Sequence, residues 1–190
     1  FSWWDFVRRN NDELVATYGN LVHRVLTFTY RNFQEKIPQP EELDQAAQDI
    51  LARVSQLFQD VGHSLELCHF RNALSSAMSM AQEANRYLDS KEPWKTLKEN
   101  PQGTATTLWV VLSVINCLNT ALYPFLPFSS EKLHQMLGFK DDLSERGWSW
   151  EPSKDALPPG QSMNTPEALF TKLDDAVAAA EVERLGQPVI

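Results

Sequence analysis

Apolar residues recur at intervals of three and four along most of the chain, which is the spacing of one face of an α-helix. Alternating β-branched runs are few, and the chain has only seven glycines. The pattern therefore predicts an all-α fold, an antiparallel bundle of α-helices. The expected helices cover residues 5–33, 41–61, 70–89, 93–99, 104–123 and 129–137, followed by an alanine-rich helix over residues 174–185.

Glycine and proline mark the expected ends of these elements. Gly62-His63 should end the second helix, and Gly138 should end the sixth as a glycine just past the last turn. We expect a helical bundle over residues 1–138 and an irregular surface excursion over residues 139–165, because that segment has three prolines and no helical periodicity. Residues 166–190 should form a strip and a helix that pack back on the bundle.

The most apolar helix should lie at the centre of the bundle. Residues 108–126 are interrupted by serine, asparagine, threonine and proline, so this stretch is expected to be a core helix and not a membrane span. Cys68 and Cys117 are too few and too isolated for a disulfide framework or a zinc site. We interpret both as small core residues in a reducing compartment.

No pattern of catalytic or metal-binding residues stands out. The four histidines lack metal-ligand spacing, and there is no nucleophile–histidine arrangement and no phosphate-cradling glycine loop. The formal net charge of −8 gives little long-range attraction for phosphates. Several arginines and lysines gather in the first hundred residues, however, so a nucleic-acid surface can still be local.

The stretch from Asn85 to Trp94 predicts a helix end, a polar turn and a new helix start. Proline is tolerated at the first position of a helix, so Pro93 places Trp94 just after a break in the chain. An aromatic ring flanked by asparagine and arginine on a loop suits stacking on an unpaired base. The alternative is that Trp94 packs the next helix onto the bundle, because tryptophan is mostly buried.

A second polar group lies in the first helix. Asn20 and Arg24 are one turn apart on the face that also carries Thr27 and Arg31. Asparagine offers a donor and an acceptor, and arginine a planar fork of donors, so the pair is suited to base edges. The alternative is an ordinary solvated polar stripe.

Short motifs run through nearly the whole chain: Gly19-Asn20-Leu21-Val22-His23-Arg24, Phe70-Arg71-Asn72-Ala73-Leu74, Asn85-Arg86-Tyr87-Leu88, Pro93-Trp94, Pro124-Phe125-Leu126-Pro127, Lys132-Leu133, Leu137-Gly138 and Leu169-Phe170-Thr171-Lys172-Leu173-Asp174-Asp175. In this order they resemble the anticodon-binding α-helical domain of the methionyl-tRNA synthetases, a family of class I aminoacyl-tRNA synthetases. The resemblance implies the helical bundle typical of that domain.

The resemblance also implies roles for five residues. Asn20 and Arg24 match the pair that hydrogen-bonds the first anticodon bases, and Trp94 matches the tryptophan on which the wobble cytosine of CAU stacks. Pro93 matches the residue that shapes this corner. Asp89 matches an acidic position that disfavours wrong anticodons.

Two further residues and two departures complete the expected site. Arg86 and Lys91 lie near Trp94 in sequence and are candidates for phosphate contacts. Ala16 and Gln82 stand where some members of the family carry asparagine and aspartate. These departures concern the rejection of noncognate anticodons and leave the main recognition of CAU unchanged.

By this resemblance the chain is part of a cytoplasmic ligase that joins methionine to its tRNA using ATP and Mg²⁺. The sequence does not begin with methionine, and we expect the catalytic domain to precede Phe1. This part would bind without catalysing and without a cofactor or metal of its own. Its expected partners are initiator and elongator methionine tRNA and the catalytic domain of the same chain. Residues 166–190 and the apolar residues at both ends can contact that catalytic domain. Neither DNA nor a membrane is an expected partner.

Two other functions remain open at this point. The chain can be the anticodon-binding domain of another class I synthetase, because related enzymes share variants of the Asn-x-Tyr-Leu and Pro-Trp element. It can also be a helical domain that docks onto a protein without binding RNA, which would suit its net negative charge.

Overall fold

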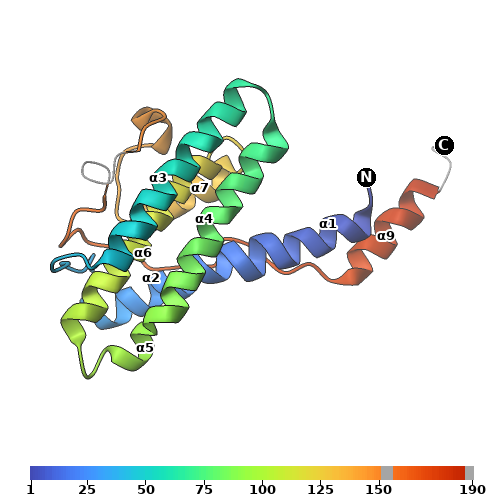
Figure 1. Cartoon of the computed structure of the whole chain (residues 1–190). Helices are drawn as coiled ribbons and strands as arrows, with labels where there is room; N and C mark the ends of the chain where they lie inside the picture. The colour runs from blue at the N-terminus through green and yellow to red at the C-terminus, as the bar shows by residue number, and fades with distance from the viewer. Residues whose placement is uncertain (151–155, 187–190) are drawn as a thin grey trace.

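The computed structural model describes residues 1–150 and 156–186, and within them regular structure is helical apart from one β-bridge between Lys36 and Ser162 (Figure 1). The prediction of an all-α fold is confirmed. The elements are α1 (Trp3–Arg9), the π-helix η1 (Asn10–Gly19), α2 (Asn20–Asn32), α3 (Gln45–Glu66), α4 (Phe70–Lys91), α5 (Pro93–Thr96), α6 (Pro101–Leu122), α7 (Pro127–Met136), the 3-10 helix η2 (Leu143–Arg146) and α9 (Asp175–Gly186).

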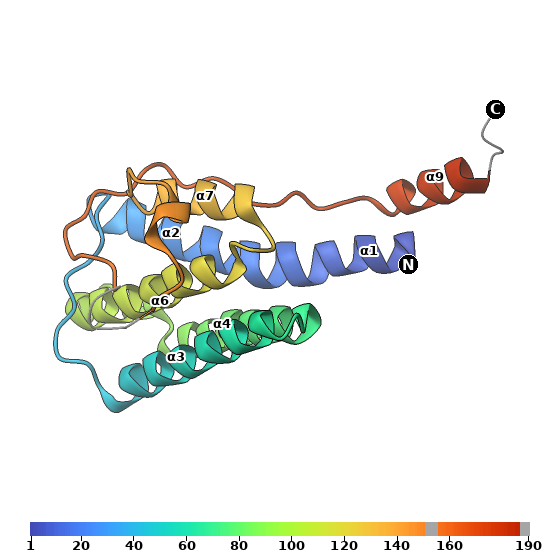
Figure 2. The ribbon, with the colours of Figure 1, turned by 90° about the horizontal axis from the view of Figure 1, so that it is seen from above.

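Helix α6 lies at the centre of the bundle. In Figure 2 the α3–α4 pair lies on one side of α6, and α2 and α7 lie on the other. Most side chains of α6 are buried, as the apolar sequence predicts. Among the described residues, α6 is long and apolar enough to cross a membrane. However, 89% of its most apolar 18-residue stretch is buried by neighbouring elements, as expected for the core helix of this bundle.

The antiparallel pair α3 and α4 packs closely because α4 presents alanines to its neighbours, among them Ala77 and Ala81, which are fully buried. The side chain of Asp44 caps α3 by accepting a hydrogen bond of 2.8 Å from the backbone N–H of Ala47. The predicted end of this helix at Gly62-His63 is wrong, because α3 continues to Glu66. Gly62 leaves room for Trp148: a Cβ at this position would lie 2.8 Å from the indole nitrogen.

Proline occupies the first position of α5, α6 and α7, at Pro93, Pro101 and Pro127. This position needs no intrahelical N–H, so the prolines fix helix starts in the bundle. The break before α5 is sharp because Glu92 is left-handed, with φ of 42°. Gly138 ends the α7 region with φ of 93°, as the sequence predicts.

The expected first helix is continuous from Trp3 to Asn32, but its middle third is a π-helix. In this segment the Thr17 hydroxyl donates a hydrogen bond of 2.8 Å to the carbonyl of Asp12, five residues earlier. A hydrophobic pattern with a period near 3.6 does not distinguish this geometry from an ordinary helix. The π-helix therefore was not predicted.

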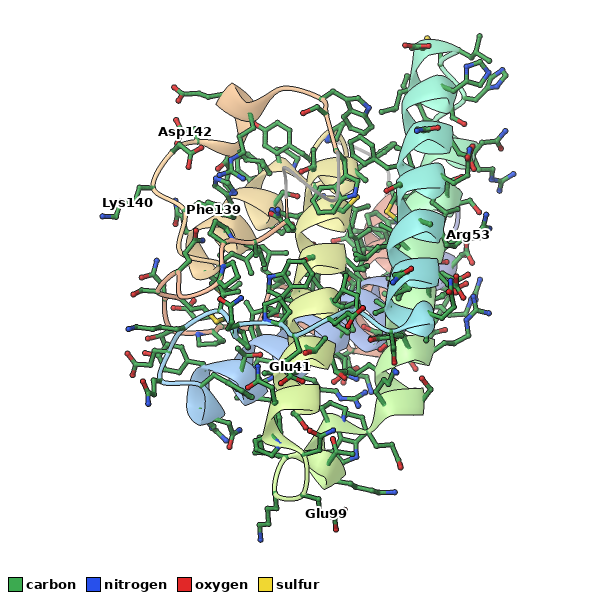
Figure 3. The ribbon with its side chains drawn as sticks, turned by 60° about the vertical axis from the view of Figure 1, so that its left-hand side comes forward. Glu41, Arg53, Glu99, Phe139, Lys140 and Asp142 are labelled. Atoms are coloured by element: carbon green, nitrogen blue, oxygen red, sulfur yellow. The ribbon has the colours of Figure 1, made fainter. Side chains whose placement is uncertain are left out.

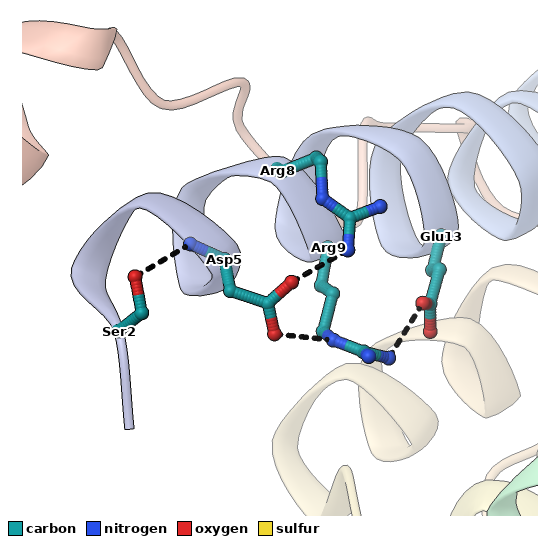
Figure 4. A network of polar contacts seen from close by, with 5 residues as sticks. All are labelled: Ser2, Asp5, Arg8, Arg9 and Glu13. Carbon is teal, nitrogen blue, oxygen red and sulfur yellow. Dashed lines mark hydrogen bonds and ion pairs between the residues drawn. The ribbon is translucent and has the colours of Figure 1, made fainter.

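The start of α1 carries a network of polar contacts (Figure 4). The Ser2 hydroxyl accepts a hydrogen bond from the Asp5 N–H, and the Asp5 carboxylate pairs with both Arg8 and Arg9. Arg9 also pairs with Glu13 at 3.0 Å. The arginines hold the pKa of Asp5 below its ordinary value, Arg9 more than Arg8. Both cations are thus engaged by carboxylates at the end of the molecule far from α5.

Residues after α7 fold back over the bundle. Trp148 stacks on Phe58 of α3, with ring centres 4.6 Å apart and planes at 17°, and Trp150 packs partly buried against the core. Farther along, the backbone N–H of Ile37 donates to the carbonyl of Gln161 at 2.9 Å. The division of the chain at residues 138 and 165 stays a prediction.

The last helix, α9, lies beside α1 and away from the bundle in both views (Figures 1 and 2). The Asn11 amide donates to the Leu173 carbonyl and accepts from the Leu173 N–H, both at 2.9 Å. Phe170 packs against Tyr18, with ring centres 5.7 Å apart. The segment before α9 is thereby fixed along the π-helix.

The two cysteines differ in their environments. Cys117 is buried in α6, as predicted. The prediction that Cys68 is a core residue is wrong: it is exposed on the turn between α3 and α4, with φ of 55°. This turn reverses the chain between two long helices at the bundle's edge, so its residues have little to pack against.

Candidate nucleic-acid interface

Helices α2, α4, α5 and α6 line an open pocket of about 400 Å³. Its volume is in the range of small-molecule and nucleotide sites. The wall is largely apolar, and its polar side chains come mainly from α2. The lining residues are His23, Arg24, Val25, Thr27, Phe28, Arg31, Asn32, Leu88, Pro93, Trp94 and Leu108. We call this the base pocket.

Trp94 forms one wall of the base pocket because of the break before α5. The left-handed Glu92 turns the chain, and Pro93 then starts α5 as a buried residue. Trp94, the second residue of α5, remains 41% exposed. Its indole therefore contacts the bundle on part of its surface and presents the rest to the pocket and to solvent.

Arg24 contacts Trp94 from the opposite wall. Its guanidinium carbon lies 4.8 Å from the centre of the indole ring, a cation–π distance. The same guanidinium lies 3.6 Å from a carboxylate oxygen of Asp89 at the end of α4. The structure thus brings Arg24 of α2 into one cluster with Asp89 and Trp94, which lie far from it in sequence on either side of the turn before α5.

Asn20 lies one turn before Arg24 on α2 and is exposed. It is not among the residues that line the base pocket. Within the described part of the chain, its side chain makes no hydrogen bond. Asn20 is therefore beside the pocket, with its amide free to contact a ligand that extends past Arg24.

Arg86 and Lys91 do not line the base pocket. Arg86 is exposed and pairs with Glu83 one turn earlier at 2.5 Å. Lys91 pairs with Asp44, the residue that caps α3, also at 2.5 Å. This pairing holds the pKa of Asp44 below its ordinary value. Both cations are thus already neutralised by carboxylates.

Lys91 borders a separate pocket that is acidic. Figure 3 shows Glu41 on the segment that precedes α3 and crosses α6, and its backbone N–H donates to the Thr106 hydroxyl at 2.9 Å. Glu42 and Asp44 line the same pocket. Burial and the charge of Asp44 raise the pKa of Tyr87 in this wall to about 12, so its hydroxyl stays neutral. Three carboxylates beside one lysine repel an anion.

Asn85, which the sequence places near Trp94, has a structural role. Its amide donates to the carbonyl of Thr17 in the π-helix at 3.3 Å and to the carbonyl of Ala81 at 3.0 Å. It therefore ties α4 to η1.

The charged residues that line the base pocket are arginines, although Asp89 pairs with one of them, Arg24, at its edge. Its lining contains two arginines and a histidine and no carboxylate, although the whole chain has a net charge of −8. Arg31, Phe28 and Thr27 extend the pocket along α2 beyond Arg24. Their helical spacing from Arg24 is visible in the sequence, but only the structure shows that this face meets Trp94.

No metal centre was found in the part of the chain that the structure describes. Groups of three or more histidine, cysteine, aspartate or glutamate side chains positioned to hold a metal ion are absent from residues 1–150 and 156–186.

Relatives in sequence are methionine–tRNA ligases. One from Dehalococcoides mccartyi strain 195 is 46% identical over 187 residues, covering 98% of this chain and 33% of the relative. One from Roseiflexus castenholzii is 40% identical over 209 residues, covering 97% of this chain and 35% of the relative. The chain thus spans about a third of the length of these relatives.

Solved structures give the same result. The apo form of Mycobacterium tuberculosis methionyl-tRNA synthetase superposes with a TM-score of 0.81 at 26% identity, covering 88% of this chain and 34% of that one. The same enzyme bound to methionyl-adenylate gives 0.79 at 26% identity, with 87% and 33% covered.

A sequence model described as the anticodon binding domain of methionyl tRNA ligase matches residues 37–187. This range contains α3 to α9, including Trp94 and Asp89, whereas Asn20 and Arg24 lie before it. Of the two synthetase assignments left open by the sequence, the match supports the methionine family. The chain therefore belongs to the methionyl-tRNA ligase family, as its anticodon-binding domain.

Proposed function

We propose that this domain recognises the CAU anticodon of methionine tRNA through the base pocket. The observation that supports this most directly is the half-exposed Trp94 ring in a pocket lined by arginines and no carboxylate. Single-stranded anticodon bases are recognised by stacking on aromatic rings and by hydrogen bonds to their edges. The pocket supplies both kinds of group.

Each residue has a distinct role in this proposal. The wobble cytosine stacks on Trp94, whose position is set by Pro93 and the turn at Glu92. Arg24 and Asn20 donate to the edges of the first anticodon bases, as their one-turn spacing on α2 allows. Asp89 restrains Arg24 and repels phosphates or bases that approach in a wrong position.

The relatives are about three times as long as this chain, so we assign ligation to the whole protein. In that protein, methionine is joined to initiator and elongator tRNA in the cytoplasm at the expense of ATP, with Mg²⁺. The part described here supplies no cluster of metal ligands, and no step with ATP is assigned to its residues. Its task is to hold the anticodon while a catalytic domain of the same chain acts on the other end of the tRNA.

The first experiment is a titration of the 190-residue chain with two RNA stem-loops at low salt. One carries CAU, and in the other uridine replaces the cytosine. We expect tighter binding of the CAU stem-loop. Trp94→Ala should weaken that binding by about tenfold to a hundredfold, because stacking on an aromatic side chain contributes roughly 1–3 kcal/mol per base.

Trp148→Ala is the matched control. Trp148 is 42% exposed, close to the 41% of Trp94, but it stacks on Phe58 outside the base pocket. This variant should bind both stem-loops as the parent does. Equal binding of the two stem-loops by the parent would contradict recognition of CAU. A large fall in the melting temperature of Trp94→Ala, with RNA binding unchanged, would show that Trp94 only packs the bundle.

A domain that docks onto a protein is the second candidate, because large apolar residues are exposed at the α1 end. Phe1, Trp4 and Phe6 are 97%, 52% and 44% exposed. We propose that they contact the catalytic domain in the longer protein. Because phosphate contacts weaken with added salt, binding that is indifferent to salt would favour protein docking. A failure of the chain to bind either stem-loop at low salt would leave protein docking as its only proposed function.

A further inference from the structure

A second hollow, of about 510 Å³, lies between the α1–η1 side of the molecule and the first half of α4. It is larger than the base pocket, and hydroxyl, amide and guanidinium groups make up much of its lining. Arg9, Glu13 and Thr17 line it from the α1–η1 side, and residues between Arg71 and Gln82 line it from α4. We call it the η1–α4 groove.

The groove follows the same two helices that meet at the base pocket. On α4, Gln82 comes seven residues before Asp89, so the two share a face and lie roughly 10 Å apart along the helix axis. Asp89 pairs with Arg24 at the edge of the base pocket. Between the two hollows, the Asn85 amide joins α4 to the carbonyl of Thr17. A strand that leaves the base pocket along α4 toward Gln82 therefore enters the groove.

The groove contains a cation that no carboxylate neutralises. Arg9 pairs with Asp5 at 2.8 Å and with Glu13 at 3.0 Å, so the carboxylate in the lining is already matched. Arg71 is exposed, and within residues 1–150 and 156–186 its side chain has no ion pair, hydrogen bond or ring contact. An arginine without a carboxylate partner keeps its full attraction for an anion.

The neutral side chains of the groove suit a sugar–phosphate backbone. Asn72, Ser75 and Gln82 are exposed, and in the part of the chain that the structure describes their side chains make no hydrogen bond. Amides and hydroxyls of this kind contact phosphate and sugar in nucleic-acid complexes, and they can also bind a ribose 2′-hydroxyl. The described residues that line the groove include no aromatic ring, so it offers a base no stacking surface like that of Trp94.

The distance from the base pocket fits a backbone that continues past the anticodon. Arg71 comes 18 residues before Asp89, which places the two roughly 27 Å apart along α4. Stacked nucleotides advance by about 3.4 Å each along a strand, so the groove lies roughly three to eight nucleotides from a base stacked on Trp94. In a tRNA anticodon arm, this separation leads from the loop into the stem.

We propose that the η1–α4 groove binds the sugar–phosphate backbone of the anticodon stem, with Arg71 in contact with one of its phosphates. The proposal rests on the proposed function, because it requires RNA in the base pocket. The groove adds affinity that does not depend on the anticodon sequence. Selection of the base stays with the base pocket and Asn20.

The test compares Arg71→Gln with the matched control Arg53→Gln in the 190-residue chain. Arg53 is exposed on α3 and lines neither the groove nor the base pocket (Figure 3). Neither variant should change the circular dichroism spectrum or the melting temperature. The CAU stem-loop and its uridine variant are titrated over a series of KCl concentrations. The slope of log affinity against log salt measures phosphate contacts.

A further set of CAU stem-loops locates the contact. In each of them one backbone phosphate is replaced by a neutral methylphosphonate. A neutral phosphate that Arg71 contacts should weaken binding of the parent but have no further effect on Arg71→Gln, because the interaction is already lost. A neutral phosphate beside the wobble cytosine should affect both proteins equally.

We expect Arg71→Gln to weaken both stem-loops by the same factor, roughly tenfold at low salt, as for loss of a charge-assisted hydrogen bond. The salt slope should become shallower by about 0.7–0.9, the value for one phosphate contact. Arg53→Gln should change neither quantity. Arg71→Lys should keep the slope and recover part of the affinity, because it keeps the charge but loses the planar fork.

Four outcomes would overturn the proposal. If Arg71→Gln leaves affinity and slope unchanged while Trp94→Ala still removes discrimination, the groove has no part in RNA binding and the proposed function stands. If Arg71→Gln weakens only the CAU stem-loop, Arg71 contacts a base edge. If the coupled phosphate lies within the anticodon itself, the strand does not follow the groove. If neither stem-loop binds the parent chain, the proposed function fails together with this inference.

Discussion

The guanidinium of Arg24 lies over the ring of Trp94, with its central carbon 4.8 Å from the ring centre. An arginine thus covers part of the indole that is proposed to stack on a base. Asp89 helps to hold it there, at 3.6 Å. In the unbound domain, Arg24 therefore covers part of the ring surface on which a base would stack. A bound base must displace the guanidinium or stack beside it.

This arrangement predicts the effect of Asp89→Asn. Removal of the carboxylate frees Arg24 and removes a negative charge near the RNA, so both stem-loops should bind more tightly. The gain should be about twofold to fivefold at low salt, because exposed ion pairs are worth roughly 0.2–1 kcal/mol. The affinity ratio of CAU to its uridine variant should fall, which fluorescence titration measures.

Glu83→Gln is a suitable control for Asp89→Asn. It removes the carboxylate that pairs with Arg86 on α4 but leaves the base pocket intact. Its effect on RNA affinity should be smaller than that of Asp89→Asn. Weaker RNA binding by Asp89→Asn would show that the carboxylate contacts the RNA favourably, contrary to the arrangement described here.

His134 predicts a dependence of stability on pH. The imidazole is fully buried and stacks on Phe139 at 4.5 Å. Burial and the positive charge of Arg146 lower its pKa from 6.5, against the opposing charges of Asp141 and Glu131. Below about pH 6.5 the unfolded chain therefore binds a proton that the folded chain resists, and the free energy of unfolding should fall as pH decreases.

Urea denaturation from about pH 7.5 to pH 5 measures this effect, since unperturbed histidine titrates near 6.5. Asp44 and Asp141 have pKa values held below 3.8, by Lys91 and Arg146 respectively, so their contributions are lost only at lower pH. His134→Gln should lose less stability than the parent across this range. An identical loss in both proteins would assign the pH dependence to other groups.

Gly138 should not tolerate a side chain. Its φ is 93°, and a Cβ there would lie 1.9 Å from the carbonyl oxygen of Ser162. Gly138→Ala should therefore reduce the free energy of unfolding by about 2–4 kcal/mol, from backbone strain and the clash together. The midpoint of urea denaturation checks this.

Gly160→Ala separates these two causes. Gly160 has φ of 82°, but nothing lies within 4 Å of an added Cβ. This variant should lose only about 1–2 kcal/mol, the cost of the left-handed conformation for a residue with a side chain. Equal losses at Gly138 and Gly160 would exclude a contribution from the contact with Ser162.

Asn85→Ala should affect stability and not base selection. The amide joins α4 to the carbonyl of Thr17, and its loss should cost about 0.5–1.5 kcal/mol, the usual net value of a hydrogen bond. The ratio of affinities for the two stem-loops should stay that of the parent. A melting curve and the two titrations on the same preparation distinguish this from a direct role in binding RNA.

The sequence predicted the helices well where a local signal fixes their ends. Pro93 and Gly138 lie at such ends, and the residue requirements at these positions come from the backbone itself. Gly62 carried a misleading signal of the same kind. It lies inside α3, where Trp148, far along the chain, packs against it, and local pattern contains no information about that contact.

The candidate site was predictable in part for a similar reason. Asn20 and Arg24 share a helix, so their common face follows from spacing alone. Arg86 and Lys91 are near Trp94 in sequence, but helix geometry and the turn at Glu92 direct them to carboxylates on other surfaces. That Arg31 meets the same pocket as Trp94 depends on the packing of α2 against α4 and α6, which no local pattern encodes.

The continuous rod from α1 to α2 has a mechanical consequence. Arg24 comes 21 positions after Trp3, and at about 1.5 Å per residue the two are roughly 30 Å apart along the axis. If the helix rotated as a rigid body by about 5° about its α1 end, Arg24 would move by roughly 2–3 Å, nearly the length of a hydrogen bond. The paired hydrogen bonds of Asn11 to Leu173 attach the segment before α9 to the π-helical part of this rod, between its α1 end and the base pocket, so a rotation of the rod at α1 would carry that segment with it.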